Sequence, residues 1–244
     1  MAVEKVSFEN SKGEKLAGVL HLPQEKTGKI IVMAHGFTSN KDRPKSIEVA
    51  TLLAENGFTA LRFDFGGSGE SYDTPIRIEY QVDDLKSAIN FIKNKGYDKL
   101  GLIGGSLGGL ISLSVYNEDV KAMVLFAPVT KGKTPSEYAE WKKSIEEKGF
   151  VLKEKDGRVF NISRDYIKER ESINQEELLS KVKCPVLIIH GTEDDDVPLE
   201  DSKDAMKYLP KGSKLEIIEG VGHKLDIVDG IDILSLNWFK EYLK

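Results

Sequence analysis

The sequence contains few cysteines and histidines. Its 244 residues include one cysteine and four histidines. A single cysteine excludes an intrachain disulfide framework. So few cysteines and histidines, dispersed along the chain, also disfavour a metal cluster. We interpret Cys184, which directly precedes Pro185 at the start of an apolar run, as a buried and inert thiol.

An excess of positive charge and long apolar runs are also missing. The chain carries 35 lysines and arginines against 40 aspartates and glutamates, a net charge of −5. Nucleic-acid binding needs a basic surface, so we expect no nucleic-acid partner. The longest apolar runs, residues 29–34 and 185–189, are far below the ~20 residues of a membrane span, and the first ten residues lack the apolar core of a signal peptide. We therefore expect a cytoplasmic protein without a membrane span.

Strand and helix patterns alternate along most of the chain. Residues 3–8 and 16–22 flank a polar turn and predict an antiparallel hairpin. We then expect strands at 29–34, 58–64, 99–104, 121–126, 185–189 and 215–218, and helices at 47–55, 79–95, 107–117, 199–208 and 231–243. This order predicts one α/β domain over residues 1–244, with a mostly parallel sheet and helices on both faces.

The alternation breaks between about residues 130 and 180. Trp141 and Ile145 have helical spacing, and Asp156-Gly157 lies between two short apolar stretches, which is typical of a hairpin. No glycine, serine or proline linker flanks this segment. We therefore predict an insertion packed on the main domain, with its aromatic residues serving mainly to pack it there.

Ser106 lies in the pattern that points most clearly to chemistry. The stretch Gly104-Gly105-Ser106-Leu107-Gly108 is a G-x-S-x-G element after an apolar strand and before a helix. A sharp turn between strand and helix exposes the serine oxygen, and the glycines permit that turn. Ser106 is therefore the candidate nucleophile.

A serine nucleophile needs a base and an orienting acid, which in this architecture follow the serine in the order acid, then histidine. His190 and His223 follow Ser106. His190 ends an apolar strand and is expected to be a buried structural imidazole. His223 lies in a glycine-rich loop after the next strand, where a base belongs, so we favour it. Four consecutive acids, residues 193–196, leave the choice of acid open.

Four motifs together resemble the α/β-hydrolase superfamily: His35-Gly36-Phe37, Gly104–Gly108, the run from His190 to Pro198, and Gly220–His223. The resemblance spans nearly the whole chain. It implies that Asp194, four residues after His190, is the acid, with Asp196 as second choice. It also implies an eight-stranded sheet and makes the insertion a small lid.

The resemblance extends to the oxyanion hole, where backbone N–H groups stabilise the tetrahedral intermediate. It implies Leu107, which follows the nucleophile, and Phe37, in the loop after the strand at 29–34, as the two donors. His35 is expected to support that loop. No dinucleotide or phosphate-loop signature occurs, so we expect no cofactor and no metal.

The sequence thus predicts a serine carboxylic-ester hydrolase that acts on a small-molecule ester through an acyl-enzyme. It is similar to bacterial cinnamoyl (feruloyl) esterases, which implies hydroxycinnamate or other small or medium acyl esters as substrates. The alternatives are, in order, a monoacylglycerol-lipase-like esterase, a serine peptidase, and a non-catalytic ligand-binding relative. A homodimer is left open.

Overall fold

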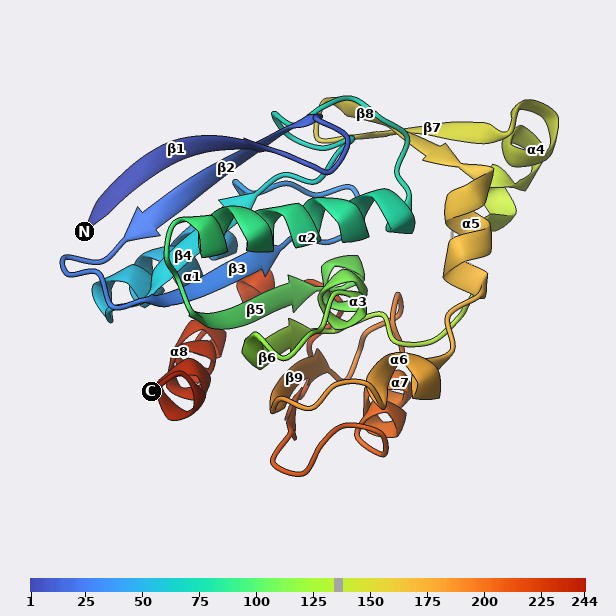
Figure 1. The fold of residues 1–244 in the computed structure, drawn as a ribbon. Coiled ribbons are helices and arrows are strands. Elements are labelled where there is room, and N and C mark those ends of the chain that lie inside the picture. Colours follow the sequence, from blue (N-terminus) through green and yellow to red (C-terminus); the bar gives the residue numbers. More distant parts are fainter. Residues whose placement is uncertain (134–137) are drawn as a thin grey trace.

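The computed structural model describes residues 1–133 and 138–244 of the chain. A single sheet of eight strands runs through the molecule, in the order β1-β2-β4-β3-β5-β6-β9-β10 (Figure 1). Its strands are β1 (Ala2–Glu9), β2 (Lys15–Leu22), β3 (Lys29–Ala34), β4 (Thr59–Phe63), β5 (Lys99–Gly105), β6 (Val120–Phe126), β9 (Val186–Gly191) and β10 (Lys214–Ile218). The β1/β2 and β2/β4 pairs are antiparallel and the remaining pairs are parallel. The predicted α/β fold with a mostly parallel eight-stranded sheet is confirmed.

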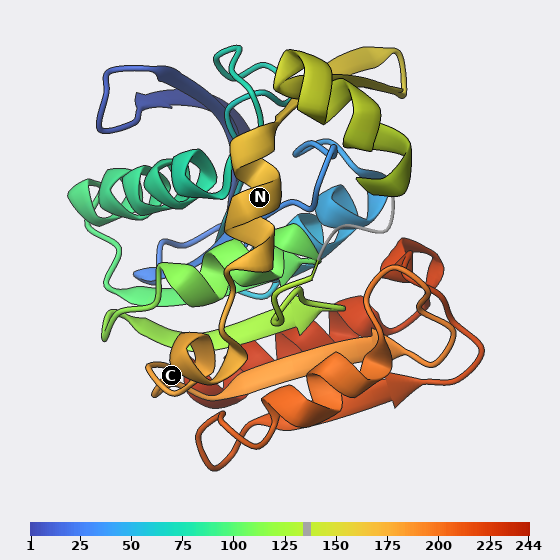
Figure 2. The same ribbon diagram turned by 90° about the vertical axis from the view of Figure 1, so that its right-hand side faces the viewer.

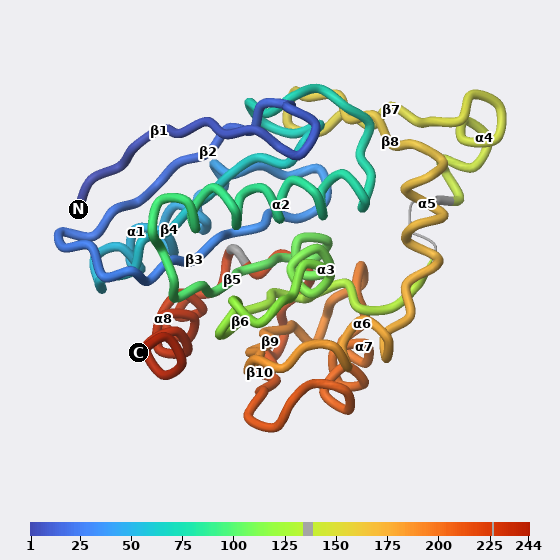
Figure 3. Tube along the Cα trace, viewed as in Figure 1, coloured from blue at the N-terminus to red at the C-terminus, as the bar shows by residue number. Residues whose placement is uncertain are grey.

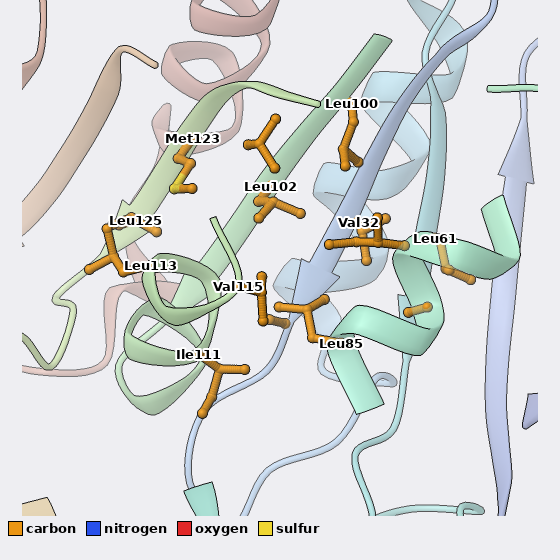
Figure 4. Packing of buried hydrophobic residues seen from close by; sticks show 14 of the residues in the cluster. Val32, Leu61, Leu85, Leu100, Leu102, Ile111, Leu113, Val115, Met123 and Leu125 are labelled. Atoms are coloured by element: carbon orange, nitrogen blue, oxygen red, sulfur yellow. The ribbon is translucent and has the colours of Figure 1, made fainter. Parts of the chain in front are cut away.

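Helices cover both faces of this sheet, as the apolar strands require. One face carries α1 (Pro44–Glu55) and α8 (Ile231–Tyr242), whose apolar residues share a core cluster with β3 and β6. The other carries α2 (Ile78–Asn94), α3 (Leu107–Ser114), α6 (Gln175–Leu179) and α7 (Leu199–Ala205). Figure 4 shows this second core, where Leu85 and Ile111 pack against Val32 and Leu102 of the sheet.

Local sequence explains where several helices begin and end. Pro44 occupies the start of α1, where its missing N–H costs no hydrogen bond, and Gly57 follows the helix with a φ of 85°. The short α6 was not expected, because five residues show no clear helical period. Asn174 caps it by accepting a hydrogen bond from the N–H of Glu177 at 3.0 Å.

The segment between β6 and β9 contains α4 (Tyr138–Lys148), the hairpin of β7 (Phe150–Lys155) and β8 (Arg158–Ser163), and α5 (Arg164–Glu171). Asp156 and Gly157 both have positive φ, 52° and 74°, so the predicted Asp-Gly hairpin turn is confirmed. Figure 2 looks onto the edge where β3, β5 and β6 end, and α5 lies in front of that edge.

The core holds this segment in place. Trp141, Phe160 and Tyr166 are buried in a cluster that also contains Leu107 and Leu110 of α3. The backbone N–H of Ile76 also donates to the carbonyl of Asn161 in β8 at 2.7 Å. The insertion is therefore packed on the core, and these three aromatic side chains do the packing.

Figure 3 traces the chain path, with β10 beside β9 at one edge of the sheet. A short 3-10 turn, η1 (Leu225–Ile227), lies between β10 and α8 in the sequence. Cys184 is buried and free, as expected, and burial raises the pKa of its thiol to about 12, which agrees with its interpretation as an inert side chain. None of the helices in residues 1–133 and 138–244 combines the length and apolar character needed to cross a bilayer.

Candidate active site

Ser106 stands at the turn between β5 and α3. Its backbone has φ 50° and ψ −114°, a conformation that costs a non-glycine residue energy and recurs at functional sites. A Cβ at position 108 would overlap the carbonyl oxygen of Ala34, and one at position 104 would lie 2.5 Å from the Gly108 carbonyl oxygen. The two glycines are therefore required for the close crossing of β5, α3 and the end of β3 that exposes the serine.

His223 joins Ser106 to Asp194. Its Nε2 lies 3.0 Å from the Ser106 Oγ, and its Nδ1 lies 2.8 Å from the Asp194 Oδ2. A carboxylate only accepts hydrogen bonds, so Nδ1 carries the proton and donates to Asp194. Nε2 is then the acceptor for the Ser106 hydroxyl. The structure therefore brings the three predicted side chains together in the geometry that general-base activation of a serine requires.

The surroundings of His223 shift its pKa. Burial lowers the pKa of His223, but the hydrogen bond and the negative charge of Asp194 outweigh it and hold the pKa above the ordinary value of 6.5. The positive charge of Lys155 lowers the pKa of His223, so this lysine lies close enough to influence the imidazole.

The side chain of Asp194 is fully buried and accepts several hydrogen bonds. Its Oδ1 accepts the backbone N–H groups of Val197 at 2.8 Å and Asp196 at 3.0 Å. Its Oδ2 lies 3.1 Å from the Nε2 of His190, besides the bond from His223. Burial alone would raise the pKa of Asp194, but the bonds from His190 and His223 hold it far below its usual range. This carboxylate stays ionised at neutral pH.

Asp196, the second choice for the acid, and His190, the alternative base, lie in different surroundings. Asp196 is exposed and contributes its backbone N–H to Asp194. His190 is fully buried, and its Nδ1 lies 2.7 Å from the Ser202 Oγ. Its burial agrees with the sequence prediction, but its contact with Asp194 was missed. The i, i+4 spacing of His190 and Asp194 across a strand end is the signal that could have suggested it.

The loop after β3 packs against the serine turn. A Cβ at Gly36 would lie 3.2 Å from the Gly105 carbonyl oxygen and 3.5 Å from the Ser106 Cβ. Phe37 follows directly in this loop. Leu107 is the first residue of α3, so its N–H has no acceptor within the helix. Both N–H groups assigned to the oxyanion hole therefore belong to segments that adjoin Ser106.

His35 supports this loop through its ring. Its Nε2 accepts the backbone N–H of Phe65 at 3.1 Å, so its Nδ1 is protonated and donates to the Gly36 carbonyl at 2.9 Å. Burial lowers the pKa of His35, which keeps the ring neutral. The expected supporting role of His35 agrees with these contacts.

A cavity of about 430 Å³ opens at Ser106 and His223. Phe37 and Tyr166 line it with rings stacked at 5.0 Å, and Phe37 also lies 6.1 Å from the Trp141 ring. Lys153 and Lys155 of β7 reach the same cavity. These lysines were not anticipated, because only the folded hairpin brings β7 to the serine. In the described residues, no group of three or more His, Cys, Asp or Glu side chains is arranged to hold a metal ion.

Comparisons with known proteins find a matching family and related proteins. Residues 25–154, more than half of the chain, match the model of the family described as serine aminopeptidase, S33. The mitochondrial palmitoyl-protein thioesterase ABHD10 of Bos taurus is 29% identical over 181 residues, which cover 70% of this chain and 59% of that protein.

Two solved structures share the fold. The α/β hydrolase GrgF from Penicillium sp. sh18 has a TM-score of 0.84 at 20% identity, covering 100% of this chain and 99% of that one. Est1E from Butyrivibrio proteoclasticus, in its structure with ferulic acid, has a TM-score of 0.77 at 24% identity, covering 97% of this chain and 96% of that one. At these identities the likeness shows the fold alone.

Proposed function

The chain belongs to the serine aminopeptidase S33 family of the α/β hydrolases, and on that premise we propose that it is a serine carboxylic-ester hydrolase. The observation that carries the proposal is the 3.0 Å contact between the Ser106 Oγ and the His223 Nε2, with Asp194 on the other side of the ring. A serine hydroxyl becomes a nucleophile when such a base removes its proton.

In the proposed reaction, the Ser106 oxygen attacks the ester carbonyl while His223 takes its proton. The N–H groups of Phe37 and Leu107 stabilise the resulting oxyanion. His223 then gives the proton to the departing alcohol, which leaves an acyl group on Ser106. Water, deprotonated by His223, releases the acid, and Asp194 holds the imidazole in the correct tautomer throughout.

The size and lining of the cavity favour esters of small or medium acyl groups, including hydroxycinnamates, as substrates. A cavity of about 430 Å³ is within the usual size for one small-molecule ligand. The stacked rings of Phe37 and Tyr166 provide a flat apolar wall for an aromatic or short aliphatic acyl chain. We assign the insertion between β6 and β9 as a lid, since its Lys153, Lys155 and Tyr166 line this cavity.

An aminopeptidase activity is less well supported than esterase activity. An aminopeptidase must hold the ammonium group of a peptide, which a carboxylate near the nucleophile does best. Among the described residues that line the cavity, Asp196 supplies the one carboxylate, whereas lysines and arginines are numerous. This distribution favours a substrate without a positive charge.

A substrate panel tests the proposal. It contains acetate, butyrate, octanoate and hydroxycinnamate esters, a monoacylglycerol, a palmitoyl thioester and an amino-acid anilide. Hydrolysis of the esters with little turnover of the anilide supports the assignment, and the preferred acyl group then identifies the substrate class. The thioester tests the activity named for the bovine relative. Turnover of the anilide alone, or of no compound at all, would contradict the esterase assignment.

A further inference from the structure

The catalytic cavity has a positively charged lining in a chain whose net charge is −5. Part of this positive charge is neutralised by ion pairs with carboxylates that do not line the cavity. Lys41 pairs with Asp64 at 2.8 Å, and Lys45 pairs with Glu48 at 2.8 Å. Lys155 of the lid hairpin and Lys224 in the loop after His223 form a separate feature of this lining.

Two lysines of β7 point toward the catalytic loop. Lys153 and Lys155 are two residues apart in the strand, so their side chains lie on the same face. The Lys153 Nζ is 5.7 Å from the centre of the Phe37 ring. The Lys155 Nζ donates a hydrogen bond to the Thr38 Oγ1 at 3.3 Å. Both ammonium groups therefore lie beside the loop that holds a proposed oxyanion donor.

Lys224 adds a third charge at the same opening, directly after His223, and it also lines the cavity. We call Lys155 and Lys224, which both line the cavity, the cationic mouth. Partial burial lowers the pKa of Lys155, and the charges of Lys153, Arg43 and Lys224 lower it further, while the negative charge of Asp156 offsets part of this effect. Like charges held together in this way destabilise one another, and an anion placed between them removes that cost.

We propose that the cationic mouth binds a carboxylate or another oxyanion carried by the ester substrate. A lysine ammonium group is a compact charge without the rigid planar donors of arginine. It can therefore bind a carboxylate or a phosphate equally well. The proposal rests on the proposed esterase function and names its substrate class as esters with an anionic group. If the cationic mouth were only a solvated charged surface, the protein would not prefer anionic esters to neutral ones.

Matched substrate pairs test this. The acyl-side pair is mono-para-nitrophenyl adipate, which has a free carboxylate, and its methyl ester. The alcohol-side pair is para-carboxyphenyl butyrate and its methyl ester. We expect the anionic member of one pair to have a kcat/KM about tenfold higher at low ionic strength, from its partly exposed charge pairs with the two lysines. The pair that shows the preference identifies the side of the ester that carries the anion.

Salt and charge variants separate the proposed contact from other causes. The preference should nearly vanish at about 0.5 M NaCl, because salt screens exposed charges. Lys155→Gln should lower the ratio of anionic to neutral kcat/KM severalfold, and Lys155→Glu should invert it. The matched control is Lys211→Gln, which makes the same charge change in an exposed loop at the opposite end of the sheet. It should leave the ratio unchanged.

Binding provides a readout without turnover. Calorimetry with the Ser106→Ala variant should show tighter binding of the anionic ester than of its methyl ester. Equal kcat/KM values within both pairs, or a ratio that Lys155→Glu does not change, would overturn the anion site while leaving the esterase assignment intact. Absence of turnover with every ester would instead reject the esterase assignment, and the binding comparison would still decide the anion site.

Discussion

The Nε2 of His190 lies 3.1 Å from the Oδ2 of Asp194, the same oxygen that accepts the Nδ1–H of His223 at 2.8 Å. His190 is itself fixed, because its Nε2 also lies 2.8 Å from the Val197 carbonyl and its Nδ1 lies 2.7 Å from the Ser202 Oγ. The carbonyl requires a proton on Nε2, so Nδ1 accepts from the serine hydroxyl. His190 therefore holds the carboxylate of Asp194, which contacts the proposed base His223.

This contact predicts that His190 is a positioning residue. His190→Ala should lower kcat/KM by about tenfold, as is typical when a residue that orients a functional group is lost. It should also lower the midpoint of the acidic limb of the pH profile, because a less firmly held Asp194 raises the pKa of His223 less. His190→Gln, which can retain a donor near Nε2, should recover part of both. The variants are compared by pH–rate profiles and thermal unfolding. A loss of stability with an unchanged pH profile would assign His190 a structural role only.

Removal of the nucleophile should abolish turnover without unfolding the chain. Ser106→Ala is expected to lower kcat by a factor on the order of 10⁴ to 10⁶, as for other serine hydrolases. The control is Ser114→Ala, the same substitution on α3, where the hydroxyl donates to the Leu110 carbonyl at 2.8 Å. That variant should retain full activity, while circular dichroism should show both variants folded. Normal turnover by Ser106→Ala would reject the assignment of the nucleophile.

Activity should depend on the protonation of His223. A protonated imidazole cannot accept the proton of Ser106, so kcat/KM should fall as the pH falls through the pKa of His223. Burial lowers the pKa of His223, but the hydrogen bond that it donates to Asp194 and the negative charge of Asp194 together place this midpoint above 6.5. Asp194→Asn removes the raising influence, so its residual activity should have a lower midpoint. A rate that stays constant from pH 8 to pH 5 would contradict His223 as the base.

The serine turn should depend on Gly108 and much less on Gly105. Alanine usually stabilises a helix relative to glycine by about 1 kcal/mol. Its Cβ at position 108 would overlap the Ala34 carbonyl oxygen, whereas a Cβ at position 105 meets no heavy atom within 4 Å. Gly108→Ala should therefore lower the free energy of unfolding by about 2–4 kcal/mol and reduce activity. Urea unfolding compares it with Gly105→Ala, and equal stabilities would refute the steric argument.

Local patterns predicted most of the fold and indicated the main residues of the candidate site. The strand at 29–34, the Asp156-Gly157 turn and the G-x-S-x-G element each depend on short-range rules of burial, turn geometry and steric space, so the sequence predicted them. The residues alone did not choose between Asp194 and Asp196, because four acids are adjacent. The choice depended on a family resemblance, and the hydrogen bond of Asp194 to His223 agrees with it.

Contacts between distant segments could not be predicted from the sequence. Lys155 reaches Thr38 only because the β7–β8 hairpin folds back over the end of β3, across 117 positions of the chain. The stacking of Tyr166 on Phe37 depends on the same packing. The hydrophobic periodicity of the sequence does not indicate such a contact, because the contact depends on how an inserted segment packs in the folded chain.

Covalent labelling with a fluorophosphonate, followed by mass spectrometry of the intact chain and its peptides, tests the central claim most directly. The reagent forms a bond only with a serine that a base has activated. We predict one adduct on the peptide that contains Ser106, its loss in Ser106→Ala, and labelling slowed by a factor of ~10³ or more in His223→Ala. Labelling at another residue, or an equal rate in His223→Ala, would contradict the assignment of Ser106 and His223 as nucleophile and base.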